Sequence, residues 1–168
     1  MWDLLTSMYL FGIRQTNISE DVMETIYLKR KIDDFLLKWK ADNDRKPLIV
    51  KGCRQIGKTE SIRHFAKVAG YDSFIEINFV KDEKYKKIIV DGYTASAIIK
   101  NISLLDPSKR FIDGKTLIFF DEITEFPDIA TSLKFFKEDG RFDVICSGSM
   151  LGVNYKKIES NSVGYKTD

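Results

Sequence analysis

The stretch Gly52-Cys53-Arg54-Gln55-Ile56-Gly57-Lys58-Thr59 decides what fold to expect for the whole chain. It has the spacing GxxxxGKT and follows an apolar run at residues 47–50 that predicts a buried strand. Apolar residues at helical spacing come after it: Ile62, Phe65, Ala66 and Ala69. A strand, a glycine-containing loop and a helix in this order predict a phosphate-binding loop. The glycines let successive N–H groups point inward, and the helix dipole adds to the attraction for an anion.

The residue types within this loop predict separate tasks. Lys58 is expected to reach the outer phosphates of a nucleotide, and the Thr59 hydroxyl is expected to bind Mg²⁺. Lys58 is therefore also a candidate catalytic residue. The residues expected to contact the nucleotide are Gly52, Cys53, Arg54, Gln55, Ile56, Gly57, Lys58, Thr59 and Glu60.

A second pattern, Thr-Leu-Ile-Phe-Phe-Asp-Glu, occupies residues 116–122. Such a continuous apolar run is typical of a central parallel strand that is covered on both faces. Ligands of open parallel sheets bind beyond the carboxyl ends of the strands, so Asp121 and the loop are expected to meet in one crevice. We expect Asp121 to hold the Mg²⁺ shell and Glu122 to orient or deprotonate an attacking water. Adjacent acids after a strand are also common on protein surfaces, and the preceding loop is what favours a catalytic interpretation.

Two hydroxyls follow the next predicted strand, which covers residues 142–146. Ser147 or Ser149 could contact the γ-phosphate or the attacking water, so both are candidate catalytic residues. Ser-Gly-Ser is equally typical of a turn, and both interpretations stay open.

Length and composition agree with one globular domain that has its own core. The chain has 168 residues, of which 43% are hydrophobic and 31% charged. A net charge of +2 gives no basic field that would indicate nucleic-acid binding. Two cysteines and one histidine predict neither a disulfide framework nor a multi-histidine zinc site. We expect a cytoplasmic protein that does not enter a membrane, because no apolar run has membrane-spanning length and no signal-peptide pattern is visible.

The remaining sequence alternates predicted strands and helices, which indicates an α/β fold with a mostly parallel sheet. A strand at residues 74–79 contains Glu76 and Asn78, and this alternation predicts an edge position. Thr94 is expected to cap a helix. Helices are expected at residues 26–41, 81–92, 95–105 and 127–140. The first of these carries an apolar stripe expected to pack on the core: Leu28, Ile32, Phe35, Leu36 and Trp39.

Three segments together, residues 48–59, 119–123 and 146–149, resemble the AAA+-like ATPases of bacteria and archaea that carry a C-terminal domain of unknown function. Those proteins show a G-x-R-Q-x-G-K-T loop, a D-E-I segment and an S/T-G-S segment in this order. The resemblance implies a P-loop NTPase with a three-layer α/β sandwich and the strand order 5-1-4-3-2. It also implies that the ligand is ATP rather than GTP, bound with Mg²⁺.

The same resemblance predicts the domain organisation and the partners. Residues 1–22 are expected to be an N-terminal extension and residues 23–168 a P-loop ATPase core. The fifth strand and the helical lid are expected to be missing or incomplete, because the chain stops at Asp168. A C-terminal effector domain or a homo-oligomer is the expected partner.

The leading functional hypothesis is thus a Mg²⁺-dependent ATP hydrolase of the AAA+ type. One alternative is a nucleotide-binding switch with negligible turnover, and another is a truncated remnant without activity. A small-molecule kinase would use the same loop, but a water-activating Glu122 is unhelpful in an enzyme that must exclude water.

Overall fold

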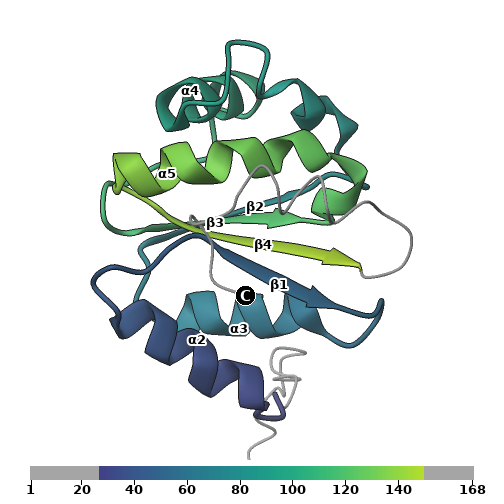
Figure 1. Cartoon of the computed structure of the whole chain (residues 1–168), viewed down its shortest axis with the longest axis vertical. Helices are drawn as coiled ribbons and strands as arrows, with labels where there is room; N and C mark the ends of the chain where they lie inside the picture. Colours follow the sequence, from purple (N-terminus) through teal and green to yellow (C-terminus); the bar gives the residue numbers. More distant parts are fainter. Residues whose placement is uncertain (1–26, 150–168) are drawn as a thin grey trace, which may run out of the picture.

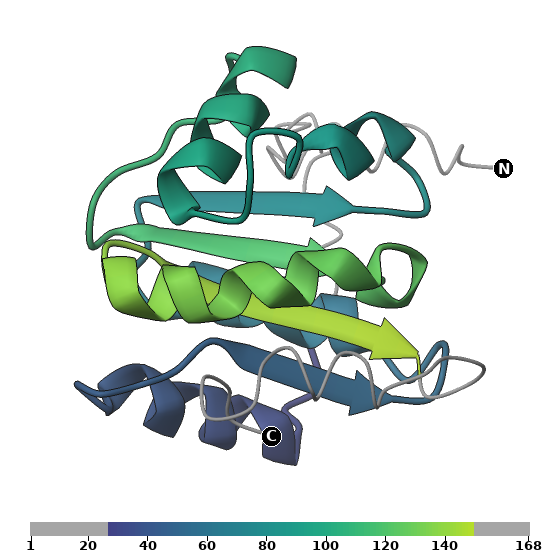
Figure 2. The same ribbon diagram turned by 45° about the horizontal axis from the view of Figure 1, so that its top comes forward.

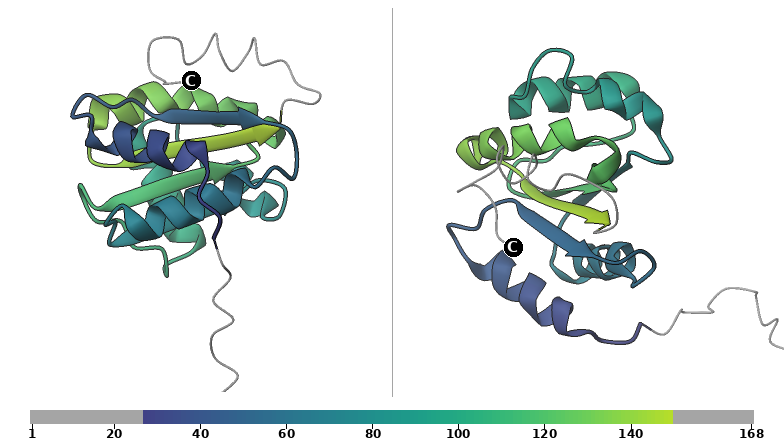
Figure 3. Two further views of the ribbon diagram at one scale, coloured as in Figure 1. Left: turned by 90° about the horizontal axis from the view of Figure 1, so that it is seen from below. Right: turned by 45° about the vertical axis from the view of Figure 1, so that its right-hand side comes forward.

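The computed structural model describes residues 27–149, which form a four-stranded parallel sheet in the order β1-β4-β3-β2. The strands are β1 (Leu48–Gly52), β2 (Ser73–Asn78), β3 (Thr116–Asp121) and β4 (Asp143–Ser149). One face of the sheet is covered by α2 (Lys31–Ala41) and α3 (Lys58–Val68), and the other by α4 (Ala95–Leu105) and α5 (Leu133–Asp139) (Figures 1 and 3). Three short 3₁₀ helices complete the described chain: η1 (Glu83–Lys87), η2 (Ile123–Glu125) and η3 (Pro127–Ser132).

This topology confirms the predicted α/β fold. The observed order corresponds to four consecutive strands, 1-4-3-2, of the predicted order, and β2 lies at an edge of the described sheet as expected. The predicted fifth strand and lid, and the extension at residues 1–22, lie outside the described residues.

The apolar run of β3 is buried on both faces, as the sequence predicts for a central strand. Leu117 and Phe119 pack into the core under α2 and α3. Ile118 and Phe120 point the opposite way, into the core under α4 and α5. All four side chains have no exposed surface. Because each strand residue points to the face opposite its neighbours, one continuous apolar segment supplies both cores of the sandwich.

The helix expected at residues 26–41 begins later than predicted, at Lys31. Arg30 has an extended backbone, and its N–H donates to the Asp33 carboxylate at 2.7 Å, which fixes the helix start. Leu28 therefore precedes the helix and is 74% exposed, so its predicted place in the apolar stripe is wrong. Phe35 is also partly exposed, whereas Leu36 and Trp39 are buried as expected.

Two further helices differ from the prediction at their starts. The segment expected as one helix from residue 127 is a 3₁₀ turn, η3, that leads into α5 at Leu133. Only a single 3₁₀ helix, η1, forms within residues 81–92. The predicted caps are confirmed: Thr94 Oγ1 accepts from the N–H of Ala97 at 3.3 Å, and Gly140 ends α5 in the left-handed conformation.

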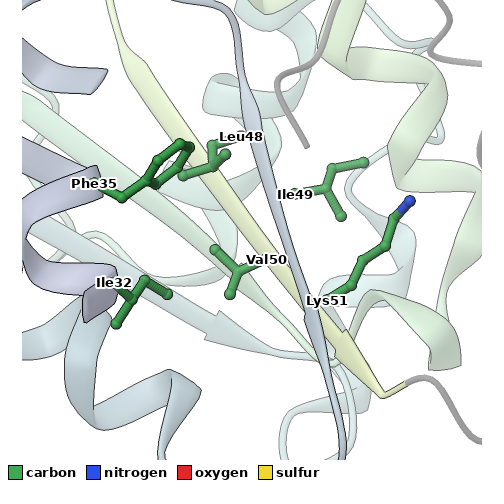
Figure 4. A pocket seen from close by; sticks show the side chains of 6 residues that line it. All are labelled: Ile32, Phe35, Leu48, Ile49, Val50 and Lys51. Atoms are coloured by element: carbon green, nitrogen blue, oxygen red, sulfur yellow. The ribbon is translucent and has the colours of Figure 1, made fainter. Parts of the chain in front are cut away.

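A pocket of ≈ 310 Å³ lies along the outer edge of β1 (Figure 4). Ile32 and Phe35 of α2 form one wall. The residues of β1 that line it are Leu48, Ile49, Val50 and Lys51, which come from both faces of the strand. The pocket therefore follows the strand edge that has no partner in the described sheet, where the predicted order places a fifth strand.

A cluster of charged and polar side chains surrounds Asp143 at the amino end of the sheet and joins separate parts of the chain there. Arg45 Nε donates to Asp143 Oδ1 at 2.6 Å, and Lys40 Nζ donates to Oδ2 at 2.8 Å. The Tyr71 hydroxyl donates to Oδ2 at 2.7 Å, and its ring lies 3.8 Å below the Lys40 ammonium. Burial alone would raise the pKa of Asp143, but these three hydrogen bonds outweigh it, so the pKa lies below its usual value.

Asp143→Asn is expected to lower the free energy of unfolding by about 2 kcal/mol at pH 7, because the hydrogen bonds from Arg45 and Lys40 lose their negatively charged acceptor. The pKa of Asp143 is lower in the folded protein than the about 3.9 of an unfolded chain. Its stabilisation is therefore present above that unfolded value and is lost as the pH falls through the folded value. Urea unfolding at pH 7 and pH 3 measures the free energy of unfolding of both proteins. The difference between wild type and Asp143→Asn should be smaller at pH 3 than at pH 7. An equal difference in the free energy of unfolding at the two pH values would contradict a stabilising role for the charged Asp143 carboxylate.

Candidate active site

The loop between β1 and α3 has the backbone that its glycines predict. Gly57 has φ 81° and Gln55 has φ 62°, so the chain turns left-handed twice within residues 52–59, here called the glycine loop. A Cβ on Gly52 would lie 2.6 Å from Cδ1 of Ile56, so a larger residue at this position would require the exposed Ile56 side chain to move. The curl lies at the carboxyl end of β1, where α3 begins (Figure 2).

Lys58 points back into this curl. Its side chain is buried, and Nζ donates to the carbonyl oxygens of Gly52 at 3.0 Å and of Cys53 at 2.7 Å. A lysine ammonium has three N–H donors and no acceptor, and these two bonds hold the positive charge inside the loop. The loop thus concentrates a cation and the positive end of α3 in one place, which is the arrangement that attracts phosphate.

Asp121, at the carboxyl end of β3, is the point where loop and sheet meet. It is 3% exposed, and its Oδ2 accepts a hydrogen bond of 3.1 Å from Thr59 Oγ1. The Ser147 hydroxyl of β4 donates to the other carboxylate oxygen, Oδ1. These contacts join the two segments that the sequence predicts to share one crevice, because parallel β1, β4 and β3 end at the same edge (Figure 2).

Asn78 completes this arrangement, a role that its position in an alternating edge strand does not predict. Its Nδ2 donates to Asp121 Oδ2 at 2.9 Å, while its Oδ1 accepts from the N–H groups of Val80 and Lys81, each at 3.0 Å. The two backbone donors fix which end of the amide is oxygen. The available signal was register: Asn78 ends β2 directly opposite Asp121.

Glu122 has an uncommon backbone and an unpaired oxygen. It adopts the left-handed conformation (φ 54°, ψ 47°), which costs free energy for a residue other than glycine. Its N–H donates to Asp121 Oδ1 at 3.1 Å. Its Oε2 is buried and has no hydrogen-bond partner among the described residues. A buried carboxylate oxygen is costly without a donor, so this side chain is suited to accept a hydrogen bond from a ligand or water.

A family model described as an AAA domain matches residues 44–168, which is most of the chain. The chain belongs to this family of AAA domains. AAA domains of this type form a nucleotide-binding, ATPase-like family, in agreement with the loop and the buried acid described above.

The fold of this AAA domain is similar to a solved structure entitled "Structure of C. elegans PCH-2", with a TM-score of 0.50 and 11% sequence identity. The similarity covers 77% of this chain but 39% of that chain, so the present sequence spans less than half of that protein's length. At this identity the likeness concerns the fold alone. A comparison with curated proteins gives no match. Within residues 27–149, none of the helices has the length and apolar character needed to cross a membrane.

The remaining candidate residues of this AAA domain occupy different parts of the site. Ser149 is buried and lies in register with Gly52, at the start of the glycine loop. The residues at the tip of the loop and at the start of α3 that are exposed to solvent are Cys53, Arg54, Gln55, Ile56 and Glu60. Arg141 precedes β4 at the opposite end of the sheet, and its guanidinium pairs with Asp139 at 2.8 Å.

The donor set of the site fits Mg²⁺. Thr59 Oγ1 and Asp121 Oδ2 lie 3.1 Å apart, close to the about 2.9 Å expected between neighbouring ligands of an octahedral ion with bonds of about 2.0–2.1 Å. Mg²⁺ in nucleotide sites takes one or two protein oxygens together with phosphate oxygens and water. Residues 27–149 contain no group of three or more His, Cys, Asp and Glu side chains that could hold a metal.

Proposed function

We propose that this AAA domain binds ATP with Mg²⁺ in the glycine loop and hydrolyses it to ADP and phosphate. The observation that carries the proposal is the 3.1 Å hydrogen bond from Thr59 to Asp121, which connects the loop to the acidic end of β3. The choice of ATP over GTP comes from the family resemblance of the loop, and the residues of the loop tip and Glu60 are proposed to contact the nucleotide.

In the proposed complex, the N–H groups of the glycine loop donate to phosphate oxygens, and Lys58 exchanges its carbonyl partners for the outer phosphates. When bound, Mg²⁺ supplies Lewis-acid stabilisation of the phosphate oxygens, and Thr59 and Asp121 are the residues that would hold it. Asn78 and Ser147 keep the Asp121 carboxylate in one orientation through their hydrogen bonds.

Glu122 is proposed to act on water. Its buried Oε2 accepts a hydrogen bond from the attacking water, orients it and takes its proton as the water oxygen bonds to the γ-phosphorus and the bond from that phosphorus to the ADP oxygen breaks. Ser149, next to the start of the loop, is proposed to contact the γ-phosphate. An effector domain or a homo-oligomer that uses this hydrolysis stays a prediction from the resemblance.

The test is phosphate release from ATP by the purified chain, measured with and without Mg²⁺ and compared with GTP. We expect release that requires Mg²⁺ and is faster with ATP. Saturable binding without release above background would contradict hydrolysis and favour the nucleotide-binding switch. If the chain neither binds ATP nor releases phosphate, the result favours the alternative of a truncated remnant without activity.

A further inference from the structure

The residues ahead of α2, together with its first residues, cross the start of α3 and are fixed there by several contacts. We call residues 27–33 the strap. The Tyr27 hydroxyl donates to Asp33 Oδ1 at 2.6 Å and lies 3.2 Å from Ser61 Oγ of α3. The Tyr27 ring stacks on His64, also of α3, with ring centres 3.7 Å apart and planes 9° from parallel. The Arg30 N–H donates to the other oxygen of Asp33. The contacts of Tyr27 therefore fasten the strap to α3, and Asp33 links Tyr27 to Arg30 within the strap.

From this position the Arg30 side chain reaches the outside of the glycine loop. Its Nη1 donates to the Ile56 carbonyl oxygen at 2.8 Å. The guanidinium also lies against Gly57, because a Cβ built on that glycine would be 2.0 Å from Nη1. Gly57 is thus required twice, once for its positive φ and once for the approach of Arg30.

The hydrogen bond has a geometric consequence for the peptide between Ile56 and Gly57. The described chain has no cis peptide bonds, and in a planar trans peptide the C=O and the N–H point in opposite directions. Arg30 holds the Ile56 carbonyl on the outside of the loop, so the Gly57 N–H must point toward the inside. Inward N–H groups of this loop are the donors that the proposed function assigns to phosphate.

We propose that Arg30 is a positioning residue that aims the Gly57 N–H at the bound phosphate by holding the Ile56 carbonyl from outside. The inference rests on the proposed nucleotide binding, but Arg30 itself does not touch the nucleotide. Because the strap is fastened to α3 and not to the ligand, the loop is oriented before phosphate arrives. Part of the entropic cost of ordering the loop is then removed from binding.

The test compares Arg30→Ala and Arg30→Lys with the wild type. Alanine removes the donor, whereas lysine keeps a cation that can reach one carbonyl. Lys29→Ala is the matched control, because Lys29 is an exposed strap cation that pairs with Asp34 rather than with the loop. Two quantities are measured: hydrogen exchange of the Gly57 amide without nucleotide, followed by NMR, and affinity for Mg–ATP by calorimetry. Thermal unfolding of each variant shows whether the fold is kept.

We expect Arg30→Ala to speed Gly57 exchange and to weaken Mg–ATP binding by about tenfold, the effect of one charge-assisted hydrogen bond. The Gly57 exchange rate and the Mg–ATP affinity of Arg30→Lys should lie between those of the wild type and Arg30→Ala. Both quantities in Lys29→Ala should match the wild type. Unchanged Gly57 exchange in Arg30→Ala, exchange that changes without an effect on affinity, or an equal loss in Lys29→Ala would overturn the proposal. If the wild type itself fails to bind Mg–ATP, the proposed function is wrong, and Gly57 exchange still decides the role of Arg30. Should Arg30→Ala fail to fold, Arg30→Lys and Lys29→Ala carry the comparison.

Discussion

Lys58→Ala is expected to weaken the binding of Mg–ATP by about 100-fold or more, because hydrogen bonds from a charged donor to phosphate are among the strongest in a protein. Lys58 is held inside the glycine loop by the carbonyls of Gly52 and Cys53, so its ammonium needs little reorganisation to meet a phosphate. Alanine removes this charge from a buried position, 9% exposed, that water reaches poorly. Isothermal titration of both proteins with Mg–ATP measures the difference.

The control for this experiment is Lys67→Ala, in the last turn of the same helix. Lys67 is exposed to solvent, so its replacement by alanine measures the effect of removing one positive charge from α3 without changing the glycine loop. It should bind Mg–ATP within a few-fold of the wild type, since exposed charges are screened. Equal affinity of Lys58→Ala and wild type would show that the loop does not hold the phosphates.

Glu122→Gln is expected to lower the rate of ATP hydrolysis by about 100-fold or more while leaving Mg–ATP affinity within a few-fold of the wild type. General-base catalysis by a carboxylate typically contributes about 10²–10⁴ in rate, and glutamine keeps the shape of the side chain but cannot take a proton. Single-turnover measurement of phosphate release separates this chemical step from product release.

Glu125→Gln is the matched control for that variant, because Glu125 lies three residues on and is exposed. It should hydrolyse ATP like the wild type. Hydrolysis that continues unchanged in Glu122→Gln would show that another group activates water. Hydrolysis absent from both wild type and control would favour the nucleotide-binding switch.

The parts of the fold that the sequence predicts well are those dominated by burial. In β3, six successive residues are buried, and such a run allows few structures other than a central strand. The glycine loop is similar, because its spacing has a strong backbone requirement at Gly57, which the structure shows with φ 81°. The meeting of Thr59 and Asp121 then follows from strand order, since parallel neighbouring strands end at the same edge of the sheet.

Features that depend on single long-range hydrogen bonds were not predictable from the sequence. Nothing local distinguishes Asn78 from another polar residue of an edge strand, and its role appears only once β2 is paired with β3. The start of α2 was misplaced because apolar periodicity continues through Leu28, whereas the hydrogen bond from Arg30 to Asp33 starts the helix later. Arg30 likewise contacts a loop that is 26 residues away in the sequence.

The 3₁₀ segments show a third kind of limit. A helix does begin at Pro127 as predicted, but its first turns are the 3₁₀ helix η3, whose Ile129 and Ala130 are buried in the core, and α5 follows it. Periodicity with a spacing of three or four residues does not separate these two kinds of helix over one or two turns.

The glycine loop and the acidic end of β3 are proposed to form one Mg–ATP site, and titration of wild type and Asp121→Asn with ATP, each with and without Mg²⁺, measures whether they do. We expect Mg²⁺ to strengthen ATP binding to the wild type by about tenfold or more, and we expect Asp121→Asn to lose this gain while keeping the Mg²⁺-free affinity. ATP binding by the wild type that is indifferent to Mg²⁺, or a full Mg²⁺ effect in Asp121→Asn, would contradict this proposal.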